Sequence, residues 1–163
     1  MHNRELCLLS LSLMGVALGC RVASLDRSLA RAEERLALYS AVLHAVTAQF
    51  PVGKRPPVET GLMPWQRPPD SLQLSSIDPP TDFLTLPDTF LSRLAREGIT
   101  GGICPPSGCR RVPSAITLSA PNVRDSVVLV QASLAGTGLE QYVMRRERDG
   151  RWSLVGRQEL FVY

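Results

Sequence analysis

The chain has 163 residues, 44% of them hydrophobic, and a formal net charge of +3 at pH 7. The hydrophobic content excludes a wholly disordered chain, and the length leaves room for one sizeable core. The positive charge is too small and too scattered for a nucleic-acid-binding surface, so we expect no nucleic-acid partner.

An uncharged apolar run lies near the start of the chain. It covers the 14 residues 6–19 and reads LCLLSLSLMGVALG. This length suits the core of a secretory signal better than a membrane span, which needs about 20 residues. Extension of the run to Leu25 reaches that length but includes Arg21, which can reach the interface. Residues 1–24 are therefore predicted to be a signal anchor or a lipoprotein signal, with an ordinary buried helix as the alternative.

The end of this run, Val16-Ala17-Leu18-Gly19-Cys20, resembles the lipobox of bacterial lipoproteins. In that pattern a small residue precedes a cysteine that is lipidated and becomes the mature N-terminus. The resemblance makes Cys20 the lipidation candidate. Ala17 stands where the pattern usually has leucine, so retention of the segment as an anchor is the alternative.

Charges and cysteines point to opposite orientations in the membrane. One arginine precedes the apolar run and four follow it by residue 35, a bias that favours a cytoplasmic domain. Cys104 and Cys109 flank Pro-Pro-Ser-Gly, a turn-forming spacer that lets the two sulfurs meet, and a disulfide there implies an oxidising compartment. Reduced thiols, and redox or metal chemistry, are the alternatives. We expect the periplasmic side of a bacterial inner membrane, with the cytoplasmic orientation as the alternative.

Two heptad series over residues 25–50 predict one long amphipathic helix of about 39 Å. A helix of that length exceeds what a small sheet covers. Its apolar seam can dock on the chain's own sheet or on a partner protein. The candidates for partner contact in the first series are Leu29, Leu36, Leu43 and Phe50.

Proline dominates the next segment, residues 51–85. Eight of the 13 prolines of the chain fall between residues 51 and 80, so we expect that neither a long helix nor a central strand forms there. The segment is predicted to be a proline-rich arm: a strap on its own domain, a partner-binding arm or a free linker. Trp65 is its candidate partner-contact residue.

Residues 86–163 are predicted to form an α+β domain. A short helix begins near Asp88 and ends near Gly98. Strand patterns follow at residues 115–119, 126–134, 139–147 and 151–163, and they predict a four-stranded antiparallel meander.

Asp149-Gly150 predicts a hairpin between the last two strands. A two-residue turn pairs Arg148 with Arg151 and puts Trp152 and Leu154 on the face opposite Tyr142 and Met144. The same register places Glu140 across from Glu159, with Arg157 available between them. A carboxylate pair of this kind can be catalytic, but the sequence supplies no pocket for it.

Sequence motifs for nucleotide binding, metal binding or nucleophilic catalysis are missing from the chain. We therefore assign no catalytic, cofactor-binding or metal-binding residue and expect no cofactor.

Four segments resemble parts of small bacterial lipoproteins or signal-anchored periplasmic proteins: Tyr39 to Leu43, Pro57 to Thr60, Leu118-Ser119 and Asp149 to Val155. A helix followed by a curved meander also resembles the α+β folds of nuclear transport factor 2 and cystatin, and this resemblance implies a cone that can hold a ligand. We expect a non-enzymatic accessory subunit that contacts the membrane and protein partners in a membrane complex, for example a photosynthetic or respiratory one. The alternative is a periplasmic lipoprotein with a ligand-binding or enzymatic pocket.

Overall fold

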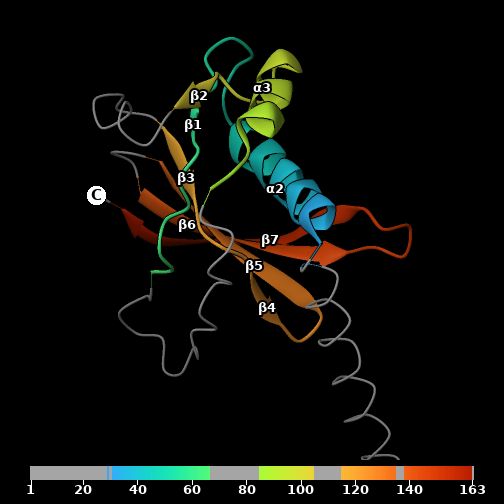
Figure 1. The fold of residues 1–163 in the computed structure, drawn as a ribbon. Coiled ribbons are helices and arrows are strands. Elements are labelled where there is room, and N and C mark those ends of the chain that lie inside the picture. The colour runs from blue at the N-terminus through green and yellow to red at the C-terminus, as the bar shows by residue number, and fades with distance from the viewer. Residues whose placement is uncertain (1–28, 30, 67–84, 105–114, 135–137, 163) are drawn as a thin grey trace, which may run out of the picture.

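The computed structural model describes residues 29, 31–66, 85–104, 115–134 and 138–162. Within this part of the chain there are two α-helices and seven β-strands (Figure 1). The helices are α2 (Ala32–Thr47) and α3 (Asp88–Arg96). The strands are β1 (Val58–Glu59), β2 (Ile103–Cys104), β3 (Ile116–Leu118), β4 (Asn122–Arg124), β5 (Val127–Leu134), β6 (Gly138–Arg146) and β7 (Trp152–Val162).

All seven strands belong to one mixed sheet. Their order is β2-β1-β3-β5-β6-β7, and β4 pairs with β5 beside this path. Strand β1 runs parallel to both β2 and β3, whereas the other pairs are antiparallel. The predicted four-stranded antiparallel meander is therefore wrong, and the α+β class holds only in its broad sense.

The proline-rich segment supplies β1, one of the three strands that the prediction missed; the other two are β2 and β4. Pro56 and Pro57 lack an N–H group, but each carbonyl accepts a hydrogen bond, from Gly101 at 2.9 Å and from Ile116 at 2.8 Å. The Val58 N–H then donates to the Gly102 carbonyl at 3.0 Å. Two prolines can thus lead directly into a central strand, because neither of them has to donate.

Beyond β1, the arm continues along the sheet as far as it is described. The Met63 N–H donates to the Leu118 carbonyl at 2.8 Å. The buried amide of Gln131 on β5 makes two hydrogen bonds to the backbone of Gln66, at 2.8 and 2.6 Å. Residues 58–66 are therefore a strap on their own domain, whereas residues 67–84 lie outside the described part of the chain.

Helix α2 is shorter than the predicted helix over residues 25–50. Arg31 has extended backbone angles, φ −82° and ψ 130°, so the helix begins after it, and it ends at Thr47. The buried side chains follow two i, i+4 rows and not the heptad seam, and Ala32 of the predicted seam is exposed. The buried residues of the helix are Leu38, Tyr39, Val42, Leu43, Val46 and Thr47.

The core lies between one face of the sheet and the two helices. Figure 1 shows α2 lying across the sheet, and it contacts β6 and β7, while α3 contacts β2. Tyr39 and Tyr142 are the largest fully buried side chains. The Tyr39 hydroxyl donates to the Ser119 carbonyl at 3.0 Å, so its buried polar atom is satisfied.

The hairpin between β6 and β7 departs from the predicted two-residue turn. Glu147 N–H donates to the Arg151 carbonyl at 2.8 Å, which leaves a three-residue loop with Gly150 at φ +84°. Trp152 consequently pairs with Arg146, and Leu154 pairs with Met144. The predicted faces of Trp152 and Leu154 are therefore wrong, since both lie on the Met144 side of the sheet.

Candidate functional site

The membrane-anchor predictions fall on the N-terminal segment. Residues 1–28, with the apolar run and the lipidation candidate Cys20, lie outside the described residues. Among the residues that are described, no helix is both long and apolar enough to cross a bilayer.

Only one of the two cysteines in the predicted disulfide lies among the described residues. Cys104 lies on β2, is 4% exposed and is disulfide-bonded. Cys109 lies outside the described residues. The pairing of Cys104 with Cys109 therefore stays a prediction.

Most of the candidate partner-contact residues pack on the protein's own core. Leu29 and Leu43 are 5% and 0% exposed and belong to the core cluster, so neither offers a surface to a partner. Leu36 and Phe50 are partly buried against the same cluster. Trp65 is half-buried at the end of the described strap. The described residues of the first heptad series therefore pack against the chain's own core.

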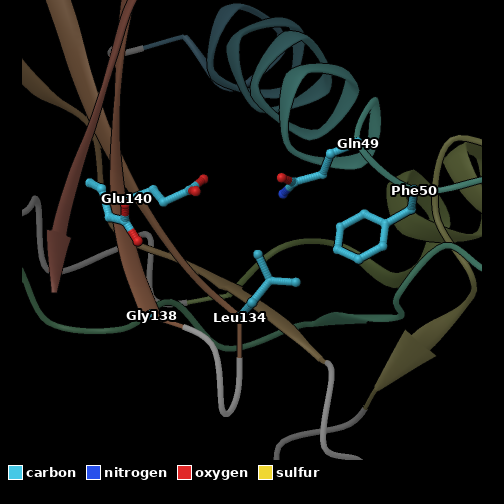
Figure 2. Close-up of a pocket in the computed structure, with 6 residues that line it drawn as sticks. Gln49, Phe50, Leu134, Gly138 and Glu140 are labelled. Atoms are coloured by element: carbon cyan, nitrogen blue, oxygen red, sulfur yellow. The ribbon is translucent and has the colours of Figure 1, made fainter. Parts of the chain in front are cut away.

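A cavity of about 300 Å³ lies where the C-terminal end of α2 meets the sheet. Figure 2 shows Gln49 and Phe50, just after α2, facing Glu140 of β6 across this space. The lining residues are Gln49, Phe50, Leu134, Gly138, Glu140 and Glu159. Its volume is at the lower end of the range for small-molecule sites.

The Glu140 side chain, 14% exposed, is held by two neighbours. The Tyr142 hydroxyl donates to one carboxylate oxygen, and Arg157 Nη2 donates to the other. Arg157 also donates to Gln49 Oε1 at 3.3 Å, and its Cζ lies 5.9 Å from the centre of the Tyr142 ring. The Arg157 guanidinium group thereby links strand β6 to the residues that follow α2.

These contacts alter the acidity of two groups beside the cavity. Burial, and next the hydrogen bond to Glu140, raise the pKa of Tyr142 well above its usual value of 10. The hydrogen bond to Glu140 also raises the pKa of Arg157. At neutral pH Tyr142 is therefore a neutral donor and Arg157 a cation.

The predicted carboxylate pair is present, since Glu140 and Glu159 are direct cross-strand partners and Arg157 forms an ion pair with Glu140. The sequence did not indicate the pocket beside them. Gln49, Leu134 and Gly138 carry no motif, and they meet only through the packing of α2 on the sheet. Phe50 was predicted to contact a partner, whereas in the structure it lines the cavity.

Within the described residues, no group of three or more histidine, cysteine, aspartate or glutamate residues can hold a metal ion. The chain matches no protein-family model, no curated protein and no solved structure at a significant level.

Proposed function

We propose that this protein is a membrane-anchored binding domain on the periplasmic face of a bacterial membrane, and that it binds a small polar ligand. The observation that carries the proposal is the cavity of about 300 Å³, with Gln49, Glu140 and Glu159 among its lining residues. Polar groups that converge on a concave surface of this volume are the usual form of a ligand site.

The anchored, periplasmic location is supported by three features. The apolar run at residues 6–19 has the length of a secretory signal core, and Cys20 follows it in a lipobox-like sequence. Cys104 is disulfide-bonded, and disulfides persist mainly in oxidising compartments.

Binding is favoured over catalysis by the state of Glu140. Both of its carboxylate oxygens already accept hydrogen bonds, from Tyr142 and Arg157. A general acid or base has to exchange a proton with the substrate at such an oxygen. Glu140 is therefore better suited to hold a fixed negative charge than to transfer protons.

The accessory-subunit hypothesis uses three contact surfaces: the anchor, the apolar helix seam and the proline-rich arm. Leu29 and Leu43 of the seam are part of the core, so this surface offers less to a partner than expected. A ligand site explains the polar cavity, which a purely structural subunit does not need.

The test uses the full chain in detergent micelles and ligand-observed NMR with a mixture of small polar molecules. Gln49→Trp fills the cavity from an exposed position, so it should abolish the saturation-transfer signals of the bound compounds. Thr89→Trp, on the exposed side of α3, adds the same side chain elsewhere and should leave those signals unchanged. Equal signals in all three proteins, or none in the parent chain, would contradict the proposal.

A further inference from the structure

From the charges around the cavity we infer that its ligand is an organic cation, a primary amine or guanidinium group carried on a short apolar body; this inference rests on the proposed function. The lining contains two carboxylates, Glu140 and Glu159, and no arginine or lysine. Arg157 beside the cavity forms an ion pair with Glu140. Among the described residues Glu159 forms no ion pair, although Arg157 also interacts with it electrostatically. Glu140, Arg157 and Glu159 together therefore carry one net negative charge beside the cavity.

Arg157 shows how this part of the molecule binds a cation. Its guanidinium group is held by the Glu140 carboxylate, by the amide oxygen of Gln49 at 3.3 Å, and by the face of the Tyr142 ring. A carboxylate, a carbonyl oxygen and an aromatic face are the groups that recognise amines and guanidinium ions. Glu159 lies directly across the strand pair from Glu140 and offers a second carboxylate to a second cation.

A metal ion is a poorer fit than an organic cation. Calcium takes about six to eight oxygen ligands, whereas this cavity offers two carboxylates, one of them already occupied. Phe50 and Leu134 give the cavity an apolar part of its wall, and Gln49 lies beside Phe50. A ligand with a cationic end toward Glu159 and an apolar body against Phe50 satisfies both parts of the wall.

The experiment compares three four-carbon compounds that differ chiefly in charge: putrescine, 1,4-butanediol and succinate. Binding to the full chain in neutral detergent is measured by isothermal titration calorimetry at low ionic strength. We expect putrescine to bind and the neutral and anionic compounds not to bind. Added salt should weaken the binding, because the attraction is between a partly exposed carboxylate and a cation.

Two variants and one control identify the residue responsible. Glu159→Gln removes the charge at an exposed position and should raise the Kd of putrescine about tenfold or more, the usual effect of losing a charged hydrogen-bond partner. Glu159→Asp keeps the charge and should retain most of the affinity. Glu33→Gln removes an equally exposed carboxylate at the other end of α2 and should change nothing.

The possible failures are distinguishable. If succinate or butanediol binds and Gln49→Trp abolishes that binding, the cavity is a ligand site and the cation assignment is wrong. If putrescine binds equally well to Glu159→Gln, the assignment is also wrong. If no compound in the NMR mixture or in this series binds the parent chain, the proposed function itself fails.

Discussion

Tyr142 is the residue that connects the core to the cavity. Its ring is fully buried under α2, and its hydroxyl reaches Glu140 at the cavity wall. Burial of the hydroxyl is tolerated because it has an acceptor. The orientation of Glu140 therefore depends on the packing of the core as well as on Arg157.

Alkaline pH should destabilise the fold through its two buried tyrosines. The pKa of Tyr142 and that of Tyr39 are both raised, chiefly by burial, whereas an unfolded tyrosine ionises near pH 10. A raised folded-state pKa means that stability is complete below about pH 10 and falls above it, by about 1.4 kcal/mol per pH unit for each tyrosine. Urea unfolding between pH 8 and pH 11.5 measures this slope.

Tyr142→Phe separates the contribution of that residue. The variant should lose stability at pH 8, because Glu140 loses a hydrogen bond, but its slope above pH 10 should be smaller than that of the parent chain. Formation of native-state phenolate near pH 10, seen by absorbance at 295 nm for both buried tyrosines, would be incompatible with this expectation.

At the level of elements, the β6–β7 hairpin has a longer loop than predicted, yet Glu140 and Glu159 pair as predicted. The loop has one more residue than predicted, which shifts the register near Trp152. A register shift in β7 around Val155 then restores the predicted alignment, so Glu140 still pairs with Glu159. Turn residues indicate that a hairpin exists, and Gly156, an isolated glycine inside the strand pattern, lies next to the bulge and is of the residue type that often marks one.

Helix α2 was mispredicted for a related reason. A heptad pattern assumes packing against another helix, whereas α2 packs on a twisted sheet and buries a wider stripe that includes Leu38 and Val42. Its beginning after Arg31 was also not indicated, because no proline or glycine marks that position. Periodicity therefore predicted a helix but not its length or its buried face.

Close packing between the segment before β1 and the turn before β2 predicts that Gly101 cannot be replaced. A Cβ at this position would overlap the carbonyl oxygen of Arg55, which is backbone and cannot move aside easily. Gly101→Ala should lower the free energy of unfolding by about 1–3 kcal/mol or more, the usual cost of overpacking. The measurement is the urea midpoint of the full chain.

Gly61→Ala is the matched control, since no atom lies within 4 Å of a Cβ at that position. It should be neutral, or slightly stabilising through the unfolded state. Equal midpoints for the Gly101 and Gly61 variants would show that the β1 region is not packed as described.

For the whole molecule, the redox state of Cys104 and Cys109 tests the proposed periplasmic location. We expect alkylation of the full chain in native membranes to modify Cys104 and Cys109 only after reduction, as peptide mass spectrometry can show for each cysteine. Closure of a loop over residues 104–109 corresponds to about 2 kcal/mol of stability, which reduction should remove. Alkylation of Cys104 without a reductant would favour the cytoplasmic orientation instead.

The sequence by itself determined that there is one small core, a hairpin at Asp149-Gly150 and the facing pair Glu140–Glu159, and it predicted a membrane-directed segment. These features depend on composition, local turn chemistry and the two-residue period of a strand, all of which act over short stretches of chain. Only the tertiary structure decided that β1 enters the sheet, that the apolar face of α2 packs against the chain's own core, and that a cavity opens beside Glu140. Each of these results from contacts between segments far apart in the chain, such as Gln49 with Arg157, whose energies no local pattern encodes.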